Sequence, residues 1–146
     1  NNNYVVPSGT NEFNENYTID SSSGKNDINV VLGVYRSGLQ ALDAFAVNII
    51  TRPDTAGQLI DNHVIPNAVL LADGLYTLPS GISVPTGQRE ATFNLTIDRN
   101  KLLADPDTYG GKTLVLAVGI TEPSKYELNN SLSTTIVIVK GWETLQ

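Results

Sequence analysis

Cysteine and methionine are absent from this chain of 146 residues, and charged residues make up only 16% of it. The lack of Cys excludes disulfides, thiolate metal sites and a Cys nucleophile. Because translation starts with Met, we expect Asn1 to belong to a processed or trimmed chain rather than to mark the natural start. No hydrophobic run reaches the roughly 18 residues that a membrane-spanning helix needs.

Positive charge is also scarce, since nine Lys and Arg residues stand against fifteen Asp and Glu residues, for a formal net charge of -6. Nucleic-acid binding needs clustered Lys and Arg side chains that displace counterions from phosphates, and the sequence has no such cluster. We therefore expect no nucleic-acid partner. Hydrophobic residues make up 40% of the chain, which is enough for the core of one domain.

The sequence divides into two parts of different composition. Residues 1–26 are rich in Asn, Ser and Gly and have few apolar residues, which predicts a flexible tether that can lend an edge strand. From residue 27 onward, apolar residues alternate with polar ones at the period of a β-strand. We therefore assign residues 27–146 to a β-sandwich domain.

About seven strands are expected, separated by turns that contain Gly or Pro. They cover residues 28–34, 45–49, 76–78, 82–84, 91–97, 113–120 and 132–139. The nearly continuous apolar run 113–120 predicts a central strand that is covered on both faces. The fold class is therefore predicted to be all-β, an immunoglobulin-like antiparallel sandwich with one or two short helical turns.

Two short helices are expected between the strands. Thr51 and Asp54 have the spacing of a capping box, and apolar residues follow at helical spacing from Ala56 to Val64. Asp98 can cap a single turn that ends at Leu103. The stretch 105–111 is predicted to be a loop.

Five segments resemble the immunoglobulin-like N-terminal domain of Bacteroides cell-surface lipoproteins, a family of domains of unknown function. They are LYTLP (75–79), ISVPTG (82–87), EATFNLTI (90–97), YGGKTLVL (109–116) and NNSLSTTIV (129–137). The resemblance implies export, an outer-membrane or cell-surface location, and neighbouring domains or proteins that handle glycans. It also implies that membrane contact is made only through a lipid-bearing Cys upstream of Asn1. The matched residues are turn and core residues, so the resemblance supplies no active site.

Catalytic chemistry has few candidate residues. Any Ser-His-Asp arrangement would have to use His63, the only histidine, which is placed on the apolar face of the expected helix. A structural or merely exposed role is the preferred interpretation of His63, because no partner lies at metal-ligand spacing. We expect no catalytic residue and no cofactor. Asp105 and Asp107 could contribute oxygen ligands to Ca²⁺, but a plain turn is preferred because the EF-hand pattern is absent.

Two aromatic residues are candidates for ligand binding. Trp142 follows the last strand, and Tyr35 lies on the side of the first strand opposite its apolar residues. An aromatic face can stack on the C–H face of a sugar ring. Packing at the edge of the sandwich is the preferred interpretation, and sugar stacking is the alternative.

Three functions are compatible with these features. The leading hypothesis is a non-catalytic cell-surface binding module for a polysaccharide or host glycan, with a role in glycan use or adhesion, acting through a loop end or an open sheet face. The alternative is a structural spacer or assembly domain that positions a protein partner, for example by β-strand addition. A small hydrolase is disfavoured because a nucleophile, a base and a cleft cannot be assembled from the residues present.

Overall fold

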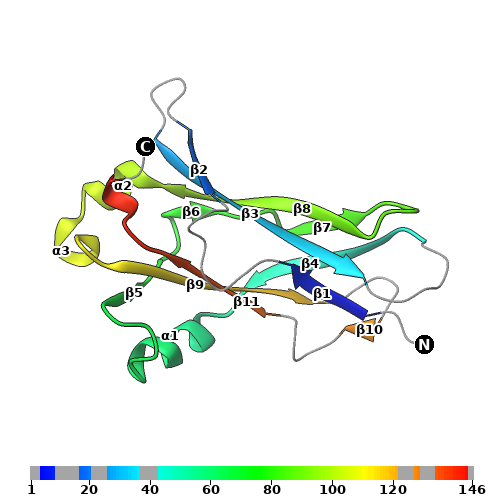
Figure 1. Cartoon of the computed structure of the whole chain (residues 1–146), viewed down its shortest axis with the longest axis horizontal. Coiled ribbons are helices and arrows are strands. Elements are labelled where there is room, and N and C mark those ends of the chain that lie inside the picture. Colours follow the sequence, from blue (N-terminus) through cyan, green and yellow to red (C-terminus); the bar gives the residue numbers. More distant parts are fainter. Residues whose placement is uncertain are drawn as a thin grey trace.

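The computed structural model describes residues 4–8, 17–20, 26–36, 43–121, 127–128 and 134–144, and these form two β-sheets packed face to face (Figure 1). The predicted all-β sandwich is therefore confirmed. Helices α2 and α3 gather at one end of the molecule, and β7 and β10 extend toward the other (Figure 1).

The first sheet has six strands in the order β10-β1-β3-β8-β6, with β2 paired to the same edge of β3 as β1. The strands of this sheet are β1 (Tyr4–Ser8), β2 (Tyr17–Asp20), β3 (Asp27–Arg36), β6 (Tyr76–Thr77), β8 (Glu90–Asp98) and β10 (Glu127–Leu128).

The second sheet has five strands in the order β11-β9-β4-β7, and β5 pairs in parallel with the start of β9. Its strands are β4 (Phe45–Thr51), β5 (Ala68–Leu70), β7 (Gly81–Val84), β9 (Thr113–Thr121) and β11 (Thr134–Val139).

All seven expected strands are present, as β3, β4, β6, β7, β8, β9 and β11. The structure adds β1, β2, β5 and β10, of which β1 and β2 lie within residues 1–26 and pair with β3. The pairings β1·β10 and β5·β9 are parallel, so the sandwich is mainly but not wholly antiparallel. Residues 132–133, expected at the start of the last strand, lie outside the described residues.

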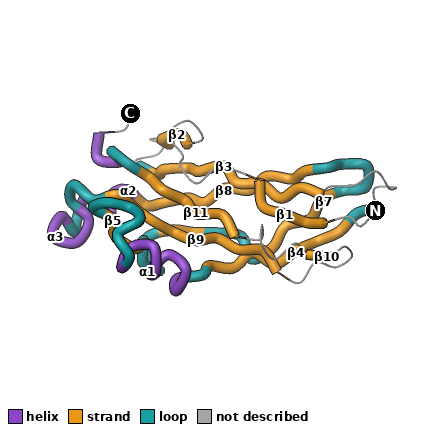
Figure 2. Tube along the Cα trace, turned by 60° about the horizontal axis from the view of Figure 1, so that its bottom comes forward, coloured by secondary structure: helices purple, strands orange, loops and turns teal. Residues whose placement is uncertain are grey.

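Strand patterning explains the core. Alternate residues of β3 and β8 point between the sheets, and Ile28, Val30, Leu95 and Ile97 are fully buried. The strand β9 is buried on both faces, as predicted. Its outer face contacts α1 (Pro53–Asp61) through a second apolar cluster, and Figure 2 shows α1 and β5 on that side of the molecule.

The helices differ in detail from the expectation. The predicted capping box at Thr51 is wrong, because Thr51 ends β4 and the N-cap of α1 is Arg52, which makes no side-chain cap hydrogen bond. Pro53, whose fixed φ suits a first helical turn, starts the helix instead. Asp98 caps α2 (Arg99–Leu103) as predicted.

The expected loop at 105–111 contains a third helix, α3 (Pro106–Tyr109), so that prediction is wrong over these four residues. The helix forms because Asp105 accepts a hydrogen bond from the Thr108 N–H and Pro106 stands in the first turn. Within the described ranges, no helix has the length and apolar character needed to cross a bilayer.

Candidate functional site

A polar hollow of about 340 Å³ opens at the end of the first sheet, beside α2. It is lined by Asp27, Gly74, Leu75, Tyr76, Thr77, Thr96, Asp98 and Lys101. This volume lies near the lower end of the ~300–1,000 Å³ range of small-molecule sites. The lining combines carboxylates, hydroxyls, an ammonium group and an aromatic ring.

Strand register brings the two carboxylates of the polar hollow together. Asp27 begins β3 and Asp98 ends β8, and the two residues are paired in the antiparallel ladder. Side chains of directly paired residues project from the same face of a sheet. The row one step inward holds Thr96, whose hydroxyl donates to Asn29 Oδ1 at 2.9 Å.

The first turn of α2 closes one side of the polar hollow. Asp98 accepts a hydrogen bond from the Lys101 N–H at 3.2 Å, which starts the helix. The Lys101 Nζ atom donates to the Gly74 carbonyl at 3.1 Å. Gly74 has a φ of +90°, a backbone conformation that favours glycine. The hydrogen bond from Lys101 to Gly74 thus holds the first turn of α2 against the segment that leads into β6.

Tyr76 lines the polar hollow and also a second, mostly apolar hollow of about 230 Å³. The second hollow is lined by Thr51, Pro53, Leu70, Leu71, Ala72, Asp73, Tyr76 and Leu116. The Tyr76 hydroxyl donates to Asp73 Oδ1 at 2.9 Å, which fixes the ring where the two hollows adjoin.

Burial raises the pKa of the Tyr76 phenol above its ordinary value, because the charged phenolate loses solvation. The hydrogen bond to the Asp73 carboxylate raises the pKa further, and a hydrogen bond with Thr51 acts in the opposite direction. Tyr76 is therefore a neutral hydrogen-bonding group at physiological pH. It acts as a hydrogen-bond donor to Asp73 rather than as a base.

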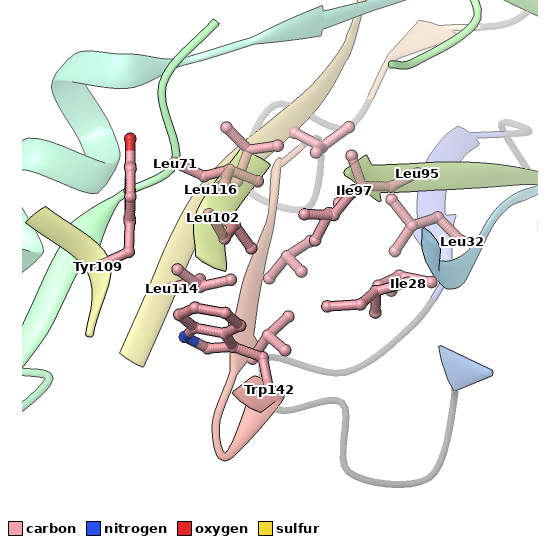
Figure 3. Close-up of a cluster of buried hydrophobic side chains, with 14 of the residues drawn as sticks. Ile28, Leu32, Leu71, Leu95, Ile97, Leu102, Tyr109, Leu114, Leu116 and Trp142 are labelled. Carbon is pink, nitrogen blue, oxygen red and sulfur yellow. The ribbon is translucent and has the colours of Figure 1, made fainter. Parts of the chain in front are cut away.

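Trp142 lies in the hydrophobic core and is 1% exposed, so its assignment as a sugar-stacking residue is wrong. Figure 3 shows the indole among the core side chains, near Leu114. The ring nitrogen donates to the Lys112 carbonyl at 3.0 Å, which satisfies the one polar atom of the side chain. The packing interpretation of Trp142 holds, and no sugar can reach its faces.

Tyr35 is 37% exposed on the outer face of β3 and lines neither hollow. It pairs with Glu90 at the opposite end of β8 from the polar hollow. Its role in ligand binding stays a prediction.

Asp105 and Asp107 flank Pro106 at the start of α3, where the Asp105 carboxylate serves as the helix cap. No group of three His, Cys, Asp or Glu side chains that could hold a metal ion occurs among the residues that the structure describes. His63 does not lie on the predicted helix face, because α1 ends at Asp61. It is an exposed residue with a φ of +56°, and it lines neither hollow.

The residues of the polar hollow carry no motif in the sequence. They come from four segments that lie up to 74 positions apart, from Asp27 to Lys101. The only available signal is the placement of Asp27 and Asp98 at the ends of two predicted strands, and the sequence does not reveal that these strands are paired.

No protein-family model and no curated protein sequence matches the chain. Solved structures with a similar fold include several from Bacteroides. A putative carbohydrate binding protein from Bacteroides ovatus matches with a TM-score of 0.64 and 11% identity, over 94% of this chain and 36% of that one. A multidomain protein including DUF1735, also from B. ovatus, matches with a TM-score of 0.64 and 13% identity, over 93% and 44%.

An auxiliary nutrient binding protein from Bacteroides thetaiotaomicron matches with a TM-score of 0.57 and 15% identity, over 92% of this chain and 41% of that one. Identities this low show a shared fold. The chain spans less than half the length of each of these three proteins.

Proposed function

We propose that this domain is a non-catalytic, cell-surface binding module that recognises a polysaccharide or host glycan at the polar hollow. The polar hollow itself carries the proposal. Sugar hydroxyls both donate and accept hydrogen bonds, and the lining offers carboxylate acceptors at Asp27 and Asp98 with hydroxyls at Thr77 and Thr96. Tyr76 pairs with the buried Ile97 and packs against the core, so its ring supports the wall of the polar hollow from the core side.

The solved neighbours support the same class of ligand. One is described as a putative carbohydrate binding protein and another as an auxiliary nutrient binding protein. A binding role also agrees with the chemistry of the site, since the hydroxyl of Tyr76 is held neutral and His63 is not among the residues that line the hollow.

Export as a lipoprotein, with display at the outer membrane or cell surface, completes the proposal. It rests on the family resemblance of the sequence and on the Bacteroides origin of the structural neighbours. Labelling of intact cells with a membrane-impermeant reagent tests it. Labelling of the native protein supports surface display, and labelling only after lysis contradicts it.

The experiment that tests binding is a thermal-shift screen against neutral and acidic oligosaccharides. A ligand that binds only the folded state raises the melting temperature. The variant Thr77→Arg places a long side chain in the polar hollow from an exposed position, and it should abolish the shift. Ser83→Arg, at an exposed position of β7 in the other sheet, is the matched control and should keep it.

A spacer or assembly role is the alternative function. The observation that favours it is that the same fold occurs within longer chains, of which this chain spans 36% to 44% in the three cases above. This alternative predicts no melting shift across the screen and recovery of a specific partner protein by affinity capture. A shift that Thr77→Arg removes would decide against it.

A further inference from the structure

The outer face of β3 and β8 continues directly from the polar hollow. Residues of the two strands that point away from the core lie in paired rows along this face. The rows are Asp27 with Asp98, Asn29 with Thr96, Val31 with Asn94, Gly33 with Thr92, and Tyr35 with Glu90. The first two rows supply three residues of the hollow lining, so the hollow and the face form one surface.

We infer that this outer face extends the polar hollow into a binding surface for a neutral polysaccharide chain. Tyr35 provides an aromatic contact at the end of the face opposite the hollow. The inference rests on the proposed function. The inference adds two statements to the proposed function: the ligand is a chain rather than a single sugar, and the chain is uncharged.

The length of the face fits a chain. From Thr96 to Glu90 the strand β8 advances six residues, which corresponds to roughly 20 Å at the usual rise of an antiparallel strand. That distance exceeds one sugar ring several times. A chain anchored in the polar hollow therefore passes Val31 and reaches Tyr35.

Two side chains on this face leave apolar surface accessible to a ligand. Val31 is 45% exposed and Tyr35 is 37% exposed. In the other sheet, α1 packs on the outer face of β9, and Figure 2 shows α1 on the side of β9 away from β3 and β8. The C–H face of a pyranose can cover Val31 and stack on the Tyr35 ring.

Charge complementarity selects a neutral chain. The side chains between the two ends of the face are uncharged: Asn29, Val31, Thr92, Asn94 and Thr96. Acidic residues stand at both ends, with Asp27 and Asp98 at one and Glu90 at the other. A uronic-acid chain would bring its carboxylates against these acids and against a molecule of net charge -6, whereas the hydroxyls of a neutral chain can donate hydrogen bonds to the same acids and to the hydroxyl and amide groups between them.

The test is calorimetric titration with oligosaccharides of two to six units from neutral glucan, mannan and xylan, and with oligogalacturonate of the same lengths. Affinity for one neutral series should rise steadily with length. Tyr35→Ala should weaken binding of the hexasaccharide about tenfold and leave the disaccharide nearly unchanged. Thr92→Arg, which obstructs the middle of the face, should also weaken binding of the hexasaccharide and leave the disaccharide nearly unchanged. Val64→Ala, at a 62% exposed site after α1, is the control and should have no effect on binding.

The outcomes distinguish failure of the extended face from failure of the proposed function. If a disaccharide binds as tightly as a hexasaccharide, or if Tyr35→Ala and Thr92→Arg leave hexasaccharide binding intact while Thr77→Arg abolishes it, the extended face is wrong and the hollow stands. If oligogalacturonate binds as tightly as the neutral oligosaccharides, the inference that the ligand is uncharged is wrong. Absence of binding by every oligosaccharide overturns both.

Discussion

The role of a single residue in this chain depends on its surroundings more than on its type. Trp142 and Tyr35 are both aromatic and both lie near the end of a strand, yet Trp142 is 1% exposed and Tyr35 is 37% exposed. The indole of Trp142 joins the end of the chain to the main core, and its hydrogen bond to Lys112 fixes the turn before β9.

Trp142→Ala should lower the free energy of unfolding by about 3–5 kcal/mol, because it empties a large buried volume and leaves the Lys112 carbonyl without its donor. Urea denaturation followed by circular dichroism measures the change. Val64→Ala is the control and should stay within about 0.5 kcal/mol of wild type. A loss below about 1 kcal/mol for Trp142→Ala would show that the indole is not a core element.

Tyr76 should ionise at higher pH in the folded protein than in the unfolded chain, because burial and then Asp73 raise its pKa. The resulting stability is present below the unfolded pKa of about 10 and is lost as pH rises through the folded pKa. The difference in tyrosinate absorbance between wild type and Tyr76→Phe reports this midpoint. Asp73→Asn should lower it, and a midpoint equal to that of the urea-unfolded chain would contradict the geometry.

Among the elements, long strands with regular patterning were predictable and short or irregular ones were not. Strands β3, β8 and β9 follow from period-two alternation and from one continuous apolar run. Strands β5 and β10 have three and two residues, too few for a periodic signal. The helix α3 was missed because its cap and proline resemble a turn.

Replacement of two helix glycines by Ala should change the stability of the protein in opposite directions. A Cβ added to Gly110 at the end of α3 would lie 2.6 Å from the Pro106 carbonyl oxygen, whereas one added to Gly57 in α1 would meet nothing within 4 Å. Gly110→Ala should therefore destabilise by about 1–3 kcal/mol. Gly57→Ala should stabilise by about 0.5–1 kcal/mol, because Ala has the higher helix propensity. Equal effects of the two variants in thermal denaturation would contradict this difference.

At the scale of the whole molecule, pairing of distant strands creates the candidate site. The fold class could be predicted because each strand signals its own buried face. The polar hollow could not, because Asp27, Tyr76, Asp98 and Lys101 become neighbours only through the order β3-β8-β6 and the start of α2. The outer face of β3 and β8 was predictable only as a polar strand surface, without its continuity with the hollow.

The most direct test of the account is a map of backbone amide chemical shifts in the isotopically labelled domain during titration with the oligosaccharide that binds best. The account predicts that shifts gather at β6, at the paired ends of β3 and β8, and at the first turn of α2, and then spread along β3 toward Tyr35. Shifts confined to β7 and the turn that follows it, or to α1, would contradict a binding site at the polar hollow.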